Sequence, residues 1–172
     1  MEPLNSIGAI IRRISMVISI LIMLAVTIWL VVIWPSIPDT VPTHFGSDGT
    51  PNSWGGKTSL LLPLVFGWIA VIMLIVMEFF PQLWNIPGQG NLRVTFGKST
   101  GQNSNPPKTP GAMAAMRNML AVDRVMIALL FAMVTYFSAK CRNLPSALLI
   151  VFLVVMFGAS AFFAVRASKL NK

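Results

Sequence analysis

The chain has 172 residues, of which 55% are apolar and only 10% are charged, and its mean hydropathy is +0.75. Soluble domains carry about 25% charged residues, so this composition excludes a water-soluble globular domain and predicts an integral membrane protein. The net charge of +8 would suit a nucleic-acid-binding protein, but the basic residues stand at the ends of apolar runs, and we expect no nucleic-acid partner.

Four apolar runs are long enough to cross a bilayer. They cover residues 14–34, 60–80, 119–137 and 145–165. At ~1.5 Å per residue, a helix of about 20 residues spans the ~30 Å hydrocarbon layer. Backbone groups in lipid must bond within their own segment, which favours helices. We therefore predict an all-α integral membrane protein, a four-helix transmembrane bundle that forms one membrane domain over residues 1–172.

Lys and Arg residues divide unequally between the two ends of these helices. Nine of the thirteen fall in the terminal tails and the 81–118 connection, whereas only Lys57, Lys140 and Arg142 fall in the other two loops. The positive-inside rule therefore predicts that both termini and the 81–118 loop are cytoplasmic and that the loop 35–59 lies outside. We expect a bacterial cytoplasmic (inner) membrane, with the first run retained as an anchor because no small-residue cleavage site follows it.

The 81–118 connection is rich in proline and glycine, which predicts irregular structure with at most a short strand over Leu92–Phe96. The letters GKST at residues 97–100 match the end of a phosphate-binding loop. That motif requires a glycine where this chain has Leu92, so we expect no nucleotide and no other cofactor.

Three ionisable residues fall inside the predicted spans, namely Glu78, Asp123 and Arg124. Such residues are functional candidates by default, but these lie within about two turns of a span end, which favours anchoring at the interface. The eleven methionines are scattered, which favours apolar filler over a copper-binding stripe. We expect no metal site and no catalytic residue.

The loop between the first two spans has a composition that no helix tolerates. Its prolines hold residues 36–42 extended, and Asp48-Gly49 predicts a two-residue hairpin turn. We expect a cap in which Phe45 and Trp54 pack beneath the turn while His44, the only histidine, lies on the opposite face. His44 with Asp39 or Asp48 would bind a metal, sense acid, or hydrogen-bond within the hairpin.

This loop resembles the signature of a bacterial membrane-protein family of unknown function, best known from the immunity and signalling protein SdpI. The family pattern is Leu-Pro-Asp-x-Val-Pro-x-His-Phe, then Gly-x-Pro-Asp and Trp-Gly-x-Lys, and residues 37–45 read IPDTVPTHF. Gly49, Pro51, Trp54, Gly55 and Lys57 continue the match, and the resemblance covers about residues 25–75. Ile37, Gly46 and Asn52 replace the usual Leu, Asn and Asp, and the missing Asp weakens a metal or acid–base role.

The resemblance implies a non-enzymatic protein that protects against or senses an envelope-acting molecule through its outer loop. The partners would be the lipid bilayer and either a toxic peptide or another membrane protein. The candidate contact residues are Asp39, His44, Phe45, Asp48, Trp54 and Lys57. The alternative function is a small accessory subunit of a larger membrane complex.

Overall fold

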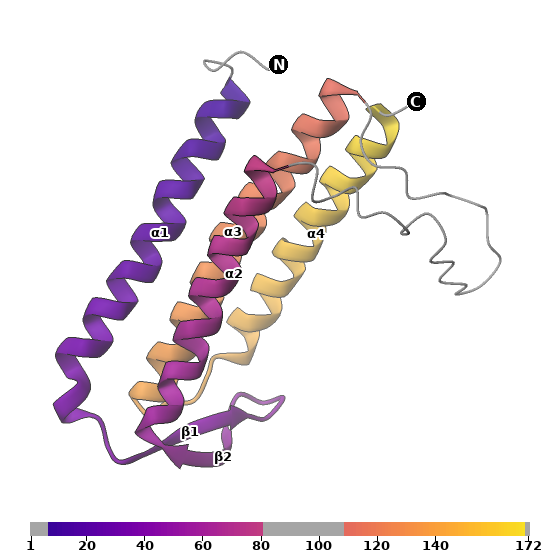
Figure 1. Ribbon diagram of the computed structural model, residues 1–172. Coiled ribbons are helices and arrows are strands. Elements are labelled where there is room, and N and C mark those ends of the chain that lie inside the picture. Colours follow the sequence, from indigo (N-terminus) through magenta and orange to yellow (C-terminus); the bar gives the residue numbers. More distant parts are fainter. Residues whose placement is uncertain (1–6, 81–108, 171–172) are drawn as a thin grey trace, which may run out of the picture.

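The computed structural model describes residues 7–80 and 109–170, which form four long helices and one hairpin (Figure 1). The helices are α1 (Ile7–Ile33), α2 (Leu61–Phe79), α3 (Pro110–Ala139) and α4 (Ser146–Leu170), and the strands are β1 (Thr40–Phe45) and β2 (Pro51–Gly56). All four helices are long and apolar enough to cross a membrane. The predicted fold class is therefore confirmed. The expected strand over Leu92–Phe96 and the GKST segment lie outside the described residues.

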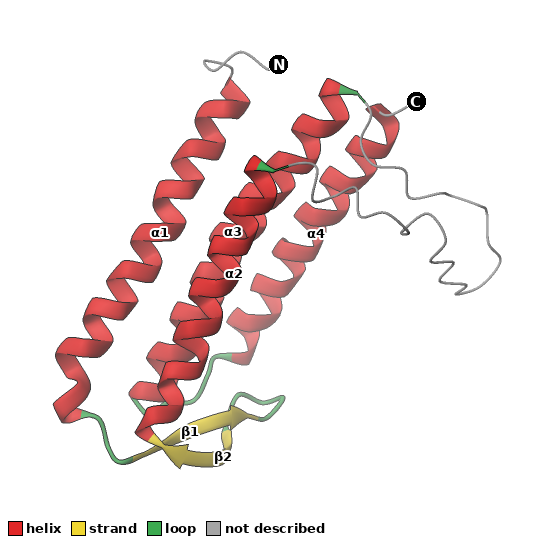
Figure 2. Cartoon of the chain, in the orientation of Figure 1, coloured by secondary structure: helices red, strands yellow, loops and turns green. Residues whose placement is uncertain are grey.

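The helices run side by side, and the hairpin covers one end of the bundle (Figure 2). The beginning of α1 and the end of α4 are both at the other end of the bundle (Figure 1). Short 3-10 turns, Trp34–Ser36 and Lys57–Leu60, connect the hairpin to α1 and α2. Pro35 stands in the first of these turns, where it stops α1 from continuing into the loop.

Helix α3 is longer than its apolar run indicates, because it begins at Pro110 rather than near residue 119. Thr109 caps it, since its hydroxyl oxygen accepts a hydrogen bond of 3.1 Å from the Ala112 amide, and Pro110 occupies the first turn. At the other end Cys141 has a left-handed φ of 49°, and the Arg142 amide donates to the Phe137 carbonyl oxygen at 3.0 Å. This is a Schellman ending.

Helix α3 is the centre of the bundle, because it packs along α1, α2 and α4, whereas α1 and α2 touch each other much less. Its buried positions carry mostly small side chains, which let neighbouring helix backbones approach closely. Such close packing matters in lipid, because no hydrophobic driving force holds the helices together there. Those small buried residues are Ala112, Ala115, Ala121, Ala128, Thr135, Ser138 and Ala139. Gly67 of α2 serves the same purpose, since a Cβ there would lie 2.9 Å from the Phe131 Cβ atom of α3.

Apolar side chains cover the outside of the bundle, as expected for a protein whose solvent is lipid. Helix α4 is the extreme case, because Ala167 is its only buried residue and α3 is its main neighbour among the described elements. A helix that is apolar all round and exposed on most faces is stable only in a membrane. The protein is thus a multi-pass membrane protein that sits in a lipid bilayer.

A buried charge network joins α1, α2 and α3 at the end opposite the hairpin. Arg124 is fully buried, and its Nη1 atom lies 2.6 Å from Oε2 of Glu78. The Nε atom of Arg12 lies 3.6 Å from Oε1 of the same carboxylate. The second terminal nitrogen of Arg124 donates to the Arg12 carbonyl oxygen at 3.1 Å and to the Ser15 hydroxyl at 2.9 Å.

The anchoring interpretation of Glu78 and Arg124 was therefore wrong, because both side chains point into the bundle and pair there instead of reaching the interface. The sequence neighbours Asp123 and Arg124 face different helices. Asp123 accepts a 2.7 Å hydrogen bond from Ser160 of α4, whereas Arg124 faces α1 and α2. Periodicity along one segment cannot reveal which charges on other segments lie opposite it.

Candidate functional site

The hairpin is irregular, and the irregularity decides which side chains face the bundle. β1 and β2 pair antiparallel from Thr40 opposite Gly56 to Phe45 opposite Pro51, with register shifts on both sides of His44. Strict alternation would put Val41 and Pro42 on opposite faces, yet both are buried. A bulge of this kind re-aims side chains, and here it leaves Thr43 and His44 exposed together.

The tip of the hairpin is a three-residue loop, so the predicted two-residue turn was one residue too short. The Gly49 amide donates to the Gly46 carbonyl oxygen at 2.9 Å, and the Gly46 amide donates to the Thr50 carbonyl oxygen at 2.8 Å. Gly49 has a φ of +80°, as the last position of such a loop requires. Asp48 accepts from the Thr50 amide at 3.0 Å, and this bond lowers the pKa of the Asp48 carboxyl below its usual value.

The tip is fastened to the connection between α3 and α4. The Leu144 amide donates to the Gly49 carbonyl oxygen at 2.8 Å. The two backbones are so close that a Cβ on Gly49 would lie 1.8 Å from the Leu144 carbonyl oxygen. Through this contact the loop between the first two helices is joined directly to the last two.

His44 pairs with an amide rather than with a carboxylate. Its Nδ1 atom lies 2.5 Å from Oδ1 of Asn52, which is hydrogen-bonding distance. Among the described residues, no hydrogen bond or ion pair joins His44 to Asp39 or Asp48. Of the alternatives left open for His44, the structure shows a hydrogen bond within the hairpin, and its partner is Asn52 rather than Asp39 or Asp48.

Two further candidates, Asp39 and Lys57, form a second, separate group at the base of the hairpin. The Lys57 Nζ atom lies 3.3 Å from Oδ1 of Asp39 and 6.0 Å from the centre of the Trp34 ring. The Lys57 amide also donates to the Asp39 carbonyl oxygen at 2.9 Å, which closes the hairpin. Since the Asp39 carboxylate is almost fully exposed, this ion pair contributes little to stability.

The aromatic residues of the loop do not form the layer that packs beneath the hairpin. Trp54 is 53% exposed, and Phe45 is only partly buried. Ile37, Val41 and Leu60 fill the core beneath the hairpin instead, where they join Leu30 and other residues of the helices. The expectation that Phe45 and Trp54 pack beneath the turn was therefore wrong for Trp54, because aliphatic residues occupy that layer and Trp54 lies on the exposed side of β2.

A groove of about 290 Å³ lies between the hairpin and the first turns of α4. His44 stands in its wall, and both polar and apolar side chains line it. From the hairpin come Thr43, His44, Phe45, Gly46, Ser47 and Gly49, and from the α4 side come Leu144, Ser146, Leu149 and Ile150. The α4 side was not among the predicted site residues, and no local sequence signal connects it to the loop.

Within residues 7–80 and 109–170, no group of three or more His, Cys, Asp and Glu side chains lies close enough to hold a metal ion. The hairpin side of the groove carries hydroxyl groups and one imidazole, which suit hydrogen bonding to a polar ligand. The apolar wall from α4 suits an aliphatic or aromatic group beside it.

Comparisons with known proteins agree with this division of the chain. The family model described as a domain of unknown function, DUF1648, matches residues 20–67, which include the end of α1, the hairpin and the beginning of α2. An uncharacterized protein of Archaeoglobus fulgidus is 32% identical over 96 residues, which is 50% of this chain and 49% of the archaeal protein. The chain thus covers about half the length of that relative. No solved structure is significantly similar.

Proposed function

We propose that this is a non-enzymatic protein of the cytoplasmic membrane that protects against or senses an envelope-acting molecule. The first candidate for this molecule is a toxic peptide. The observation that supports this proposal most directly is the groove between the hairpin and α4, which combines an exposed imidazole with an apolar wall. The resemblance of the loop to the SdpI group supports the same choice, and this loop lies within residues 20–67, which match DUF1648, a domain of unknown function.

The groove has the size of a subsite rather than of a whole ligand. A volume of about 290 Å³ holds one or two side chains of a peptide. His44 is exposed and its Nδ1 atom is held by Asn52, so the ring is oriented before a ligand arrives. Orientation before binding reduces the entropy lost on association, which is how a small contact surface gains affinity.

The test is a comparison of His44→Ala with Thr58→Ala, because Thr58 is also an exposed residue of the loop region but lies outside the groove. Both variants should fold like the wild type, as measured by thermal unfolding in detergent. Cells expressing His44→Ala should lose resistance to a panel of membrane-active peptides that wild-type protein confers, and Thr58→Ala should retain it. Equal resistance of the two variants at equal expression would reject the groove as the site.

The alternative is a small accessory subunit of a larger membrane complex. One observation favours it, namely that α4 contacts mainly α3 and leaves its other faces uncovered. Purification in a mild detergent separates the two functions. A partner present in a fixed ratio through size-exclusion chromatography supports the subunit, and a protein that is pure and still binds peptide supports protection.

A further inference from the structure

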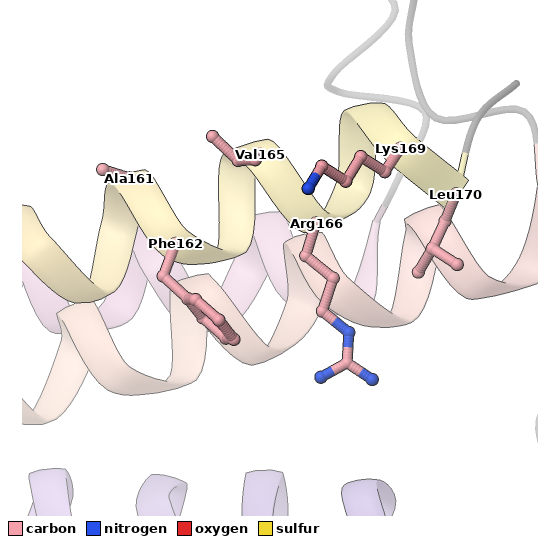
Figure 3. Close-up of a pocket in the computed structure, with 6 residues that line it drawn as sticks. All are labelled: Ala161, Phe162, Val165, Arg166, Lys169 and Leu170. Carbon is pink, nitrogen blue, oxygen red and sulfur yellow. The ribbon is translucent and has the colours of Figure 1, made fainter.

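A second groove lies at the opposite end of α4, at the surface of the bundle (Figure 3). It has a volume of about 650 Å³, and its exposed lining is almost wholly apolar. Among the described residues, those that line it come from one face of the last turns of α4, namely Ala161, Phe162, Val165, Arg166, Lys169 and Leu170. In Figure 3 the Phe162 ring and the Arg166 guanidinium project to the same side of the helix.

The position of this groove along α4 matches the boundary between acyl chains and headgroups. Arg166 lies 20 residues after Ser146, the first residue of α4, and at ~1.5 Å per residue this separation is about 30 Å, the thickness of the hydrocarbon layer. With Ser146 at one interface, Arg166 and Lys169 stand at the other. Ala161 and Phe162 lie about one turn deeper, at the level of the acyl chains.

The two basic groups of the groove are not neutralised by the protein. Arg166 and Lys169 are both exposed, and neither has an ion pair or a hydrogen bond within the described part of the chain. Arg124, by contrast, is paired with Glu78 in the interior. The groove therefore presents two free cations next to an apolar surface, and its complement is a molecule with an anionic head and a hydrocarbon tail.

We propose that this groove binds an anionic phospholipid, with the phosphate at Arg166 and Lys169 and one acyl chain along Phe162 and Ala161. A second copy of this chain fits less well. Parallel copies in one membrane would bring the same ends together, and this end also carries Arg12 and Arg13. Like charges would then meet, whereas the lipid brings the opposite charge.

The experiment uses the full chain in dodecyl maltoside with added phosphatidylglycerol or phosphatidylcholine of identical acyl chains, and native mass spectrometry counts the retained lipids. Wild-type protein should retain phosphatidylglycerol preferentially. Arg166→Gln with Lys169→Gln should lose about fivefold in retention for each charge removed. The matched control, Lys140→Gln with Arg142→Gln, removes the same charge at the hairpin end and should retain the lipid like the wild type.

Ala161→Trp provides a second variant, because it keeps both charges and fills the apolar part of the groove. It should also lower phosphatidylglycerol retention, which separates a lipid from free phosphate. Equal retention by the two double variants overturns the proposal. So does displacement of the lipid by millimolar inorganic phosphate, or a dimer that forms in place of the lipid adduct.

Discussion

Two guanidinium groups, those of Arg12 and Arg124, share the carboxylate of Glu78 in the interior of the bundle. The Nε atom of Arg124 is buried without a partner among the described residues. A buried pair is expensive to desolvate, so its main effect appears when one member is removed and the other stays buried. Glu78 is the member whose loss leaves the fully buried Arg124 without its carboxylate partner.

We therefore expect Glu78→Gln to lower the free energy of unfolding by about 3–5 kcal/mol, the usual loss when a buried pair is broken. Asp39→Asn makes the same chemical change in an exposed ion pair and should leave stability within measurement error. Thermal unfolding of both variants in detergent measures the difference. Melting temperatures that agree within a degree would mean that the network adds nothing to stability.

At the scale of the elements, the hairpin depends on one glycine. Gly49→Ala should destabilise the hairpin, because its φ is +80° and the new Cβ would meet the Leu144 carbonyl oxygen at 1.8 Å. Gly56→Ala in the same hairpin meets nothing closer than 3.8 Å and should be nearly neutral. Amide hydrogen exchange over residues 40–56 reports the result, and equal protection in the two variants would contradict the docking of the tip.

Helix packing offers a second matched pair of glycines. At Gly67 of α2 a Cβ would lie 2.8 Å from Cε of Met23 and 2.9 Å from Cβ of Phe131, so Gly67→Ala should separate α2 from α1 and α3 at a loss of about 1–3 kcal/mol. Gly158 of α4 has nothing within 4 Å, and Gly158→Ala should be neutral or stabilising. Chemical denaturation measures both effects. If the midpoint falls for Gly158→Ala but not for Gly67→Ala, this description of the packing is wrong.

The helices were predictable from the sequence because each apolar run must satisfy its backbone internally, whatever its neighbours are. The beginning of α3 was missed because residues 110–118 are too polar to count as a span, although Thr109-Pro110 carries a recognisable start signal. The hairpin was predictable from its prolines and from Asp48-Gly49. Its register was not, because a bulge beside His44 depends on how Val41 and Pro42 pack against the helices.

The candidate site was predicted in part. His44 and Phe45 do line the groove, but the wall contributed by Leu144 and Leu149 comes from a segment about one hundred residues later. The pairing of His44 with Asn52 also follows from cross-strand geometry rather than from residue type. Contacts between distant segments carry no periodic signal in a single sequence, which is why this half of the site was missed.

For the whole molecule, the distribution of charge predicts an orientation in the membrane. Arg12, Arg13, Arg166 and Lys169 lie at the end opposite the hairpin, so the hairpin should face outward. On a Cys141→Ser background, an impermeant thiol reagent applied to intact cells should modify Ser47→Cys and spare Ser104→Cys. The reverse pattern of labelling would place the hairpin in the cytoplasm and remove the basis for an extracellular ligand.

The shared carboxylate also has a consequence for biogenesis. Helix α3 is the least apolar of the four spans, and Arg124 stands at the middle of its 30 residues. An arginine at the centre of a span opposes insertion by the translocon by about 2.5–3.5 kcal/mol, and Arg124, whose neighbour Asp123 pairs with Ser160 near the basic end of α4, opposes it by less. Because α1 and α2 are synthesised first, Glu78 is already in the membrane when α3 arrives. We therefore expect α3 to insert more readily when α1 and α2 are already in the membrane and Glu78 can pair with Arg124.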